Sequence, residues 1–145
     1  MKKAFKRISA LILAVALFSS LTVAFAAEQS SLYLDSYNAS LTARTGRKII
    51  INVDVDGTGY MDKIGASSIT LFRSSDGVNF SPVATYDSED YPDLLLGSGY
   101  FFDEDVITYY GIAGCQYFAA VTVYAEDSTG SDSRFYDTNV VTCIN

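Results

Sequence analysis

The sequence of 145 residues predicts an all-β protein, an antiparallel sandwich or barrel of about seven short strands. Apolar and polar residues alternate with a period of two in several segments, which is the pattern of a strand with one buried face. Residues typical of turns, such as Asp56-Gly57 and Asp76-Gly77, separate these segments at short intervals. After residue 30 no segment carries an apolar stripe with helical spacing that is long enough for a stable helix.

The chain begins with the features of a secretory signal peptide. Four basic residues among the first seven precede an apolar run over residues 8–18, and the small side chains of Ala24 and Ala26 suit cleavage after Ala26. The apolar run is shorter than the roughly 20 residues that a membrane-spanning helix needs. We therefore expect residues 1–26 to be removed and residues 27–145 to be secreted without a membrane anchor.

The expected mature chain is a single acidic domain. Residues 1–26 contain four basic and no acidic side chains, so their removal takes the net charge from −7 to −11. The 119 residues that remain have the length of one domain and contain no linker or repeat. A surface of this charge repels nucleic acid phosphates and anionic lipids, which leaves an unknown protein or glycan as the expected partner.

The expected strands follow the alternation along the chain. Over residues 48–56, isoleucine and valine fall on one face and mostly polar side chains on the other. The same period recurs over residues 67–74 and 116–125. Together with the turn residues, the alternation predicts strands near residues 31–43, 48–56, 67–74, 79–86, 105–110, 116–125 and 133–143.

The two cysteines, Cys115 and Cys143, are expected to form a structural disulfide. They are placed symmetrically about residue 129, the centre of a predicted turn at residues 127–130, and so would face each other at the open end of one hairpin. Facing cysteines in an oxidising compartment form a disulfide. A redox-active pair is not indicated, because the two residues lack the C-x-x-C spacing that activates a thiolate.

Two segments resemble fibronectin type III domains. Gly114-Cys115-Gln116-Tyr117 and the alternating residues after it are similar to the start of the sixth strand of that family, where the tyrosine forms a tyrosine corner. Residues 69–85 resemble the third strand, the hairpin and the following strand of bacterial members. The resemblance implies a fibronectin III or immunoglobulin-like β-sandwich in which Gly114 and Tyr117 have a structural role. The tryptophan expected on the second strand of the family is absent.

The whole mature chain is also similar to a group of small secreted proteins of Gram-positive bacteria that has no assigned function. The similarity rests on the signal peptide, on residues 57–66, on the hairpin at residues 73–80 and on the hairpin at residues 117–134. These are turn and core residues. The resemblance therefore implies a fold and carries over no catalytic position.

The composition excludes most common catalytic machinery. The sequence contains no histidine, so neither a Ser-His-Asp or Cys-His arrangement nor a histidine-ligated zinc site can form. Two cysteines cannot supply a four-thiolate metal site. We therefore expect no catalytic residues, no cofactor and no enzymatic activity.

Residues 52–57 match the first half of a calcium-binding EF-hand loop, with oxygen ligands at its first, third and fifth positions and glycine at the sixth. The twelfth position, where a bidentate carboxylate is needed, is Lys63. The favoured interpretation is a polar strand face that runs into a glycine turn. A calcium site of another kind, at Asp54, Asp56 and Asp62, is the open alternative.

Two acidic clusters, at residues 87–93 and 103–105, flank an apolar stretch at residues 94–102. Paired carboxylates are the catalytic groups of glycoside hydrolases. A domain of this length has little volume for a cleft that grips a sugar, and charge runs of this kind are usually solvated loops. A small carboxylate-dependent hydrolase, relying on residues such as Glu89 and Asp103, is the least favoured alternative.

Residues 87–104 concentrate aromatic and apolar side chains in a segment with a weak strand pattern. Such a segment either caps the core or presents a contact patch, for which the candidate residues are Tyr91, Leu95, Tyr100 and Phe101. Exposed tyrosine suits contact with protein or sugar, because it brings apolar area with a polar tip. The sequence therefore predicts a secreted, non-catalytic binding module, with a carbohydrate-binding accessory as the alternative.

Overall fold

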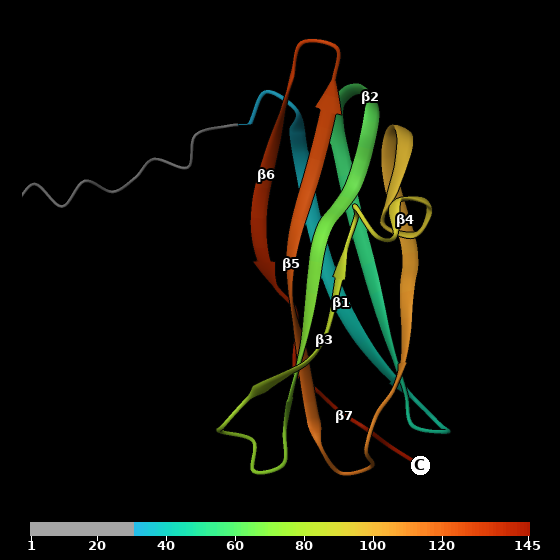
Figure 1. The fold of residues 1–145 in the computed structure, drawn as a ribbon, viewed down its shortest axis with the longest axis vertical. Coiled ribbons are helices and arrows are strands. Elements are labelled where there is room, and N and C mark those ends of the chain that lie inside the picture. Colours follow the sequence, from blue (N-terminus) through green and yellow to red (C-terminus); the bar gives the residue numbers. More distant parts are fainter. Residues whose placement is uncertain (1–30) are drawn as a thin grey trace, which may run out of the picture.

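The computed structural model describes residues 31–145, so the expected signal peptide at residues 1–26 lies outside the described residues. Antiparallel strands dominate this range and the one short helix in it is α2 (Pro92–Leu95), which confirms the predicted all-β class (Figure 1). No helix within residues 31–145 is long and apolar enough to cross a membrane. The strands are β1 (Leu34–Arg44), β2 (Lys48–Ser74), β3 (Ser81–Asp87), β4 (Leu96–Tyr110), β5 (Gln116–Asp127), β6 (Gly130–Asp137) and β7 (Val141–Thr142).

The central element is β2, which is 27 residues long. The sequence predicts two strands here, near residues 48–56 and 67–74, whereas the structure has one bent strand that also includes the expected turn. The first part of β2 pairs with β1 and β4, and the second part pairs with β3 and β5. The bend lies around Met61, where the register of the β2–β4 ladder shifts.

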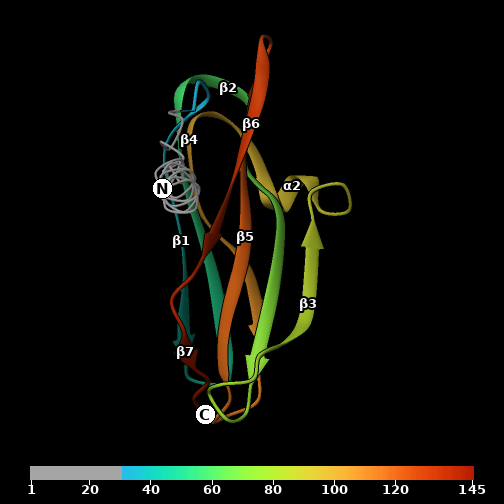
Figure 2. The same cartoon turned by 90° about the vertical axis from the view of Figure 1, so that its left-hand side faces the viewer.

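The strands lie in two layers that are joined through β2 (Figure 2). One layer contains β1, the first part of β2 and β4, and the other contains β3, the second part of β2, β5 and β6. Because β2 passes between the layers without a break, the seven strands of residues 31–145 form one curled sheet, a half-barrel. The antiparallel arrangement of seven strands is confirmed, and the two separate sheets of the predicted sandwich are corrected to this single curled sheet.

Every second side chain is buried between the layers along residues 49–55 and 69–71 of β2 and along residues 117–125 of β5, as the alternation predicts. Full burial of such an aliphatic side chain stabilises the fold by about 1.5–3 kcal/mol. The residues concerned are at most 1% exposed: Ile49, Ile51, Val53, Val55, Ile69, Leu71, Ala119, Val121, Val123 and Ala125. Since the inward positions are fixed by the core, the residues between them must face outward.

Two strand boundaries differ from the prediction. β4 begins at Leu96 rather than near residue 105, and the strand predicted at residues 133–143 is divided into β6 and β7. The division lies where Thr138 accepts a hydrogen bond from the Ala119 N–H at 2.9 Å. The next side chain, that of Asn139, bonds both to the N–H of Leu41, at 2.9 Å, and to its carbonyl oxygen, at 3.0 Å. These side chains replace the ladder bonds that a continuous strand would make.

The predicted disulfide is not formed, because Cys115 and Cys143 are both free. They are close neighbours, since the Cys143 N–H donates to the Cys115 carbonyl oxygen at 2.9 Å. Their side chains differ in environment: Cys143 is 2% exposed and its Sγ lies beside Gly111, whereas Cys115 is half-buried at the end of a turn. The backbones of Cys115 and Cys143 are therefore neighbours, as their symmetric placement predicts, but their thiols are not bonded.

Candidate functional site

Tyr117 and Gly114 lie at the crossover from β4 to β5 and serve the fold. The Ile112 N–H donates to the hydroxyl of Tyr117 at 2.9 Å, five residues back along the chain, and the Tyr117 ring is fully buried. Burial raises the pKa of the Tyr117 hydroxyl above its ordinary value. Gly114 has a φ of +84°, which a residue with a Cβ adopts only at a cost, so glycine allows the chain to turn into β5.

The four candidate contact residues divide into an exposed and a buried set. Tyr91 is 46% exposed, Tyr100 65% and Phe101 68%, which places all three at the surface. Leu95 is fully buried, so its assignment to a contact patch is wrong. The reason is α2, a single turn that directs Leu95 into the core while its neighbour Leu94 faces solvent.

Tyr100 and Phe101 belong to an aromatic cluster that we define as Tyr60, Tyr100 and Phe101. Tyr60, on β2, is 56% exposed and packs edge to face against Tyr100 with ring centroids 5.5 Å apart. Phe101 follows Tyr100 on β4 and is included for its exposure and its neighbouring position, not for a ring contact. Tyr91 is not part of this cluster, because its ring packs on Tyr86 instead, at 5.8 Å. Sequence reasoning missed Tyr60, since it lies in a stretch expected to be a glycine turn.

Four carboxylates lie beside this cluster on the outer surface of β2 and β4, and we call them the acidic face: Asp54, Asp56, Asp103 and Asp105. Asp54 pairs with Asp103 in the ladder, and Asp56 pairs with Phe101. Directly paired residues of antiparallel strands project from the same face. The buried Val53 and Val55 occupy the alternate positions, so this face is the outer one.

One neutral donor holds part of the acidic face together. The side-chain amide of Asn52 donates to a carboxylate oxygen of Asp103, at 3.1 Å, and to one of Asp105, at 3.3 Å. The pKa of Asp54 is raised from its ordinary value, first by burial and then by the charges of Asp103 and Asp56. The charges of Asp103 and Asp56 therefore add to the effect of burial and disfavour ionisation of Asp54.

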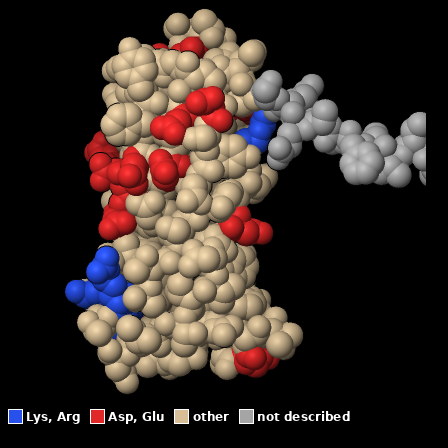
Figure 3. Space-filling model, turned by 180° about the vertical axis from the view of Figure 1, so that it is seen from behind, with Lys and Arg blue, Asp and Glu red and all other residues tan. Residues whose placement is uncertain are grey.

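The basic side chains that form ion pairs within residues 31–145 are elsewhere. Lys63 pairs with Glu126 at 3.2 Å, and Arg134 pairs with Asp132 at 2.8 Å. Figure 3 views the molecule from behind, where Asp and Glu side chains gather over one part of the surface and the visible Lys and Arg side chains lie apart from them. The acidic face is therefore a concentrated negative charge.

The residues of the open calcium alternative are not brought together as a site. Asp54 and Asp56 lie on the acidic face, and the bend of β2 comes between them and Asp62. Within residues 31–145 no group of three or more His, Cys, Asp or Glu side chains is arranged to hold a metal ion. Residues 52–57, which match the first half of an EF-hand loop in sequence, are part of strand β2, and Asp54 and Asp56 of this stretch belong to the acidic face.

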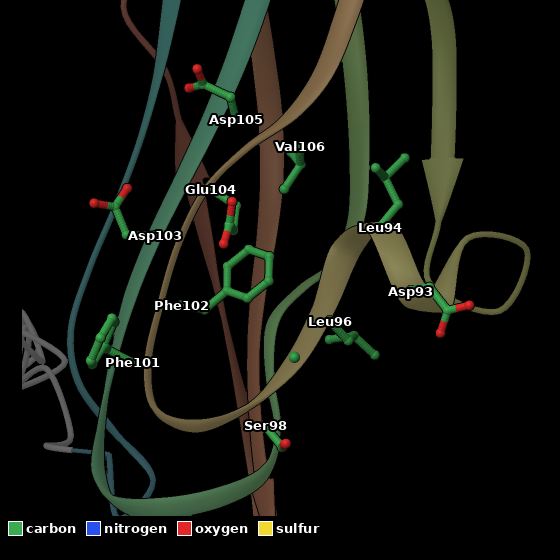
Figure 4. A pocket seen from close by; sticks show the side chains of 11 residues that line it. Asp93, Leu94, Leu96, Ser98, Phe101, Phe102, Asp103, Glu104, Asp105 and Val106 are labelled. Atoms are coloured by element: carbon green, nitrogen blue, oxygen red, sulfur yellow. The ribbon is translucent and has the colours of Figure 1, made fainter.

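A pocket of about 420 Å³ opens between α2 and β4 (Figure 4). Phe102, Glu104 and Val106 project into it from β4, and Leu94 and Leu96 lie opposite them. Phe101, Asp103 and Asp105 alternate with these residues and point away, toward the outer surface. The complete lining is Asp93, Leu94, Leu96, Gly97, Ser98, Phe101, Phe102, Asp103, Glu104, Asp105 and Val106.

The pocket is lined by all of the second acidic cluster and by Asp93 alone of the first. Asp103, Glu104 and Asp105 line the pocket with Asp93, whereas Glu89 is not among the lining residues. A hydrolase that uses Glu89 and Asp103 would need these two carboxyl groups to flank one bond of the substrate. The observed arrangement offers instead an apolar floor with carboxylates at its edge, which suits binding through contact and charge.

Comparisons of this chain with protein families, with curated proteins and with solved structures found no match.

Proposed function

We propose that the protein is a secreted, non-catalytic binding protein that engages an extracellular partner through the outer surface of β2 and β4. The observation that carries this proposal is the aromatic cluster of Tyr60, Tyr100 and Phe101, in which each ring is more than half exposed. Exposed rings grouped in this way are unfavourable in water and mark interaction sites in soluble proteins. Their position beside the acidic face gives the same surface apolar and charged contacts.

The proposal includes a fibronectin III-like architecture for the domain. Its support is the grouping of the strands into β1–β2–β4 on one side and β3–β2–β5–β6 on the other. A second support is the hydrogen bond from Ile112 to the hydroxyl of Tyr117 at the start of β5, the position of a tyrosine corner.

The proposed non-catalytic role is supported by the residue types present and by the direction in which the carboxylates point. The sequence contains no histidine to act as a general base near neutral pH. The carboxylates of the acidic face point outward from neighbouring strands, in pairs fixed by the sheet register. A geometry of this kind attracts a ligand and contains no enclosed pair of carboxyl groups across a reacting bond.

A glycan is the second candidate ligand, because rings and hydrogen-bonding groups lie side by side here. Sugar rings stack on the faces of Tyr and Phe, and their hydroxyl groups bond to carboxylate and amide side chains. Asn52, Asp103 and Asp105 supply such groups on the outer surface that also bears Phe101. The proposed contact residues are the same for a protein and for a glycan.

The test compares a variant of the aromatic cluster with a matched control. The double variant Tyr100→Ser/Phe101→Ser removes two exposed rings of the cluster, and Phe135→Ser removes a ring that is 85% exposed on β6 in the other layer. We expect binding to glycan, peptidoglycan and bacterial surface-protein arrays to fall about tenfold in the double variant and to persist in Phe135→Ser. Equal binding by all three proteins, or no binding by any, would contradict the proposal.

A further inference from the structure

The pocket between α2 and β4 combines an apolar interior with a negative edge. The side chains of Leu94 and Leu96 face those of Phe102 and Val106 across it. Glu104 projects into the same space from between Phe102 and Val106 (Figure 4). A ligand group that fits this space has an apolar stem and a polar end near the Glu104 carboxylate.

The charge of the lining selects the sign of that polar end. Four acidic residues border the pocket, Asp93, Asp103, Glu104 and Asp105, and the lining contains no Lys or Arg. The carboxylate of Glu104 projects into the space, whereas those of Asp103 and Asp105 point to the adjoining outer surface. Asp54 and Asp56 continue the negative charge along the neighbouring strand. A cation is therefore attracted both to the pocket and to the surface that leads away from it.

We propose that this pocket binds a lysine or arginine side chain of a basic polypeptide segment, an inference that rests on the proposed function and names the chemistry of the partner. The aliphatic stem of the side chain packs against Leu94, Leu96 and Phe102, and its charged end meets Glu104. Phe101, at the edge of the pocket and 68% exposed, offers its face to a second cation. Further basic residues of the segment lie along the acidic face.

The spread of the carboxylates favours a polypeptide over a metal ion or a single small cation. A metal ion needs its ligands around one point, and the described residues contain no such group. Here the carboxylates extend from Asp93 on α2 to Asp105 on β4 and across to Asp54 on β2. A segment with several basic side chains is the ligand that engages all of these positions together.

The experiment uses the mature protein and a defined probe, a ten-residue peptide of alternating lysine and serine. Binding is measured by isothermal titration calorimetry at about 50 mM and about 300 mM NaCl, because screening weakens charge attraction. We expect binding at low salt that the higher salt reduces several-fold, and no binding of a peptide in which glutamate replaces lysine. Absence of lysine-peptide binding to the wild-type protein overturns the inference.

Three variants with wild-type thermal stability locate the binding. Glu104→Gln removes the carboxylate inside the pocket and is expected to weaken binding about fivefold, and Glu104→Lys is expected to abolish it. Asp137→Asn removes one exposed carboxylate of β6 in the other layer and is expected to change the affinity by less than about twofold. Equal weakening by Glu104→Gln and Asp137→Asn means nonspecific attraction to a polyanion and overturns the pocket as the site.

The same measurements distinguish this inference from the proposed function. If the lysine peptide does not bind while an array ligand is lost in Tyr100→Ser/Phe101→Ser, the inference fails and the proposed function stands. If that array ligand is a glycan whose binding is independent of Glu104, the partner is a sugar and the inference likewise fails. If neither the peptide nor any array ligand depends on this surface, both are wrong.

Discussion

Tyr117 connects two parts of the chain through one hydroxyl group. Its ring is fully buried under the crossover between β4 and β5, and its hydroxyl accepts the hydrogen bond of the Ile112 N–H at 2.9 Å. A Cβ placed at Gly111 would lie 3.0 Å from the ring, so glycine is needed for this close approach. The hydroxyl therefore fixes the turn that leads into β5.

We predict that Tyr117→Phe lowers the free energy of unfolding by about 1–2 kcal/mol, because the Ile112 N–H loses its partner while the apolar packing stays. Urea denaturation measures the change. The matched control is Tyr110→Phe, where the side chain is 64% exposed and the expected change is within about 0.5 kcal/mol. Equal effects of the two substitutions would contradict a special role for the Tyr117 hydroxyl.

Asp54 is a carboxylate of the acidic face whose ionisation is unfavourable in the folded state. Its pKa is raised in the folded state by burial and by Asp103 and Asp56. A raised pKa means that the folded state holds the proton more tightly than the unfolded state does. The contribution of Asp54 to stability is therefore favourable at low pH and declines as the pH rises through its folded-state pKa.

We predict that Asp54→Asn raises the melting temperature by about 1–3 °C at neutral pH, since it removes the repulsion from Asp103 and Asp56. The gain should disappear at about pH 3, below the ordinary value of 3.8, where Asp54 is protonated in both states. Thermal melting followed by circular dichroism across this range provides the measurement. A gain that is the same at both pH values would show that charge is not its cause.

At the scale of elements, β2 determines how the layers are joined. Its backbone has a φ of +143° at Gly65, where a Cβ would collide with the carbonyl oxygen of Leu95 from α2. Gly59, in the same strand, has open space at the corresponding position. A side chain therefore fits at Gly59, whereas at Gly65 the contact with α2 excludes one.

We predict that Gly65→Ala destabilises the protein by about 2–4 kcal/mol, because both the backbone conformation and the contact with Leu95 oppose a side chain. Gly59→Ala is the matched control and should change the stability by less than about 1 kcal/mol. Chemical denaturation of both variants checks the prediction. A tolerated Gly65→Ala would mean that the chain does not pack as described between β2 and α2.

The sequence is sufficient to predict the alternating strands but not their connection through β2. Val53 and Val55 are buried as the period of two requires, because the core face of a strand is determined locally. Gly57 and Gly59 indicate a turn, yet the strand continues, because pairing with β4 supplies partners across the bend. Such pairing depends on residues distant in the sequence, which local patterns do not contain.

The candidate site was predictable only in part, for the same reason. The exposure of Tyr100 and Phe101 agrees with a contact segment that is rich in aromatic residues. The contact of Tyr100 with Tyr60 and the pairing of Asp54 with Asp103 join segments that only the ladder of β2 and β4 brings together. The burial of Leu95 depends on the single turn of α2, which the weak strand pattern of residues 87–104 does not predict.

Over the whole molecule, the binding features gather around one strand, β4, with the pocket on one of its faces and the acidic face on the other. The aromatic cluster, the acidic face and the pocket all involve β4 and its neighbours β2 and α2. The other layer carries a different surface, in which Phe72 stacks on Phe118 at 4.9 Å and the rings largely cover one another. The surroundings of β4 are therefore where exposed rings and grouped carboxylates occur together.

The most direct test of this account is a nuclear magnetic resonance titration of the isotope-labelled mature protein with the lysine–serine peptide. We predict that the amide shift changes are concentrated at residues 52–56 of β2 and at residues 93–106, which span α2 and the pocket side of β4. The signals of β3, β5 and β6 should stay nearly unchanged. Changes centred on β5 and β6, or spread evenly over the chain, would contradict the account.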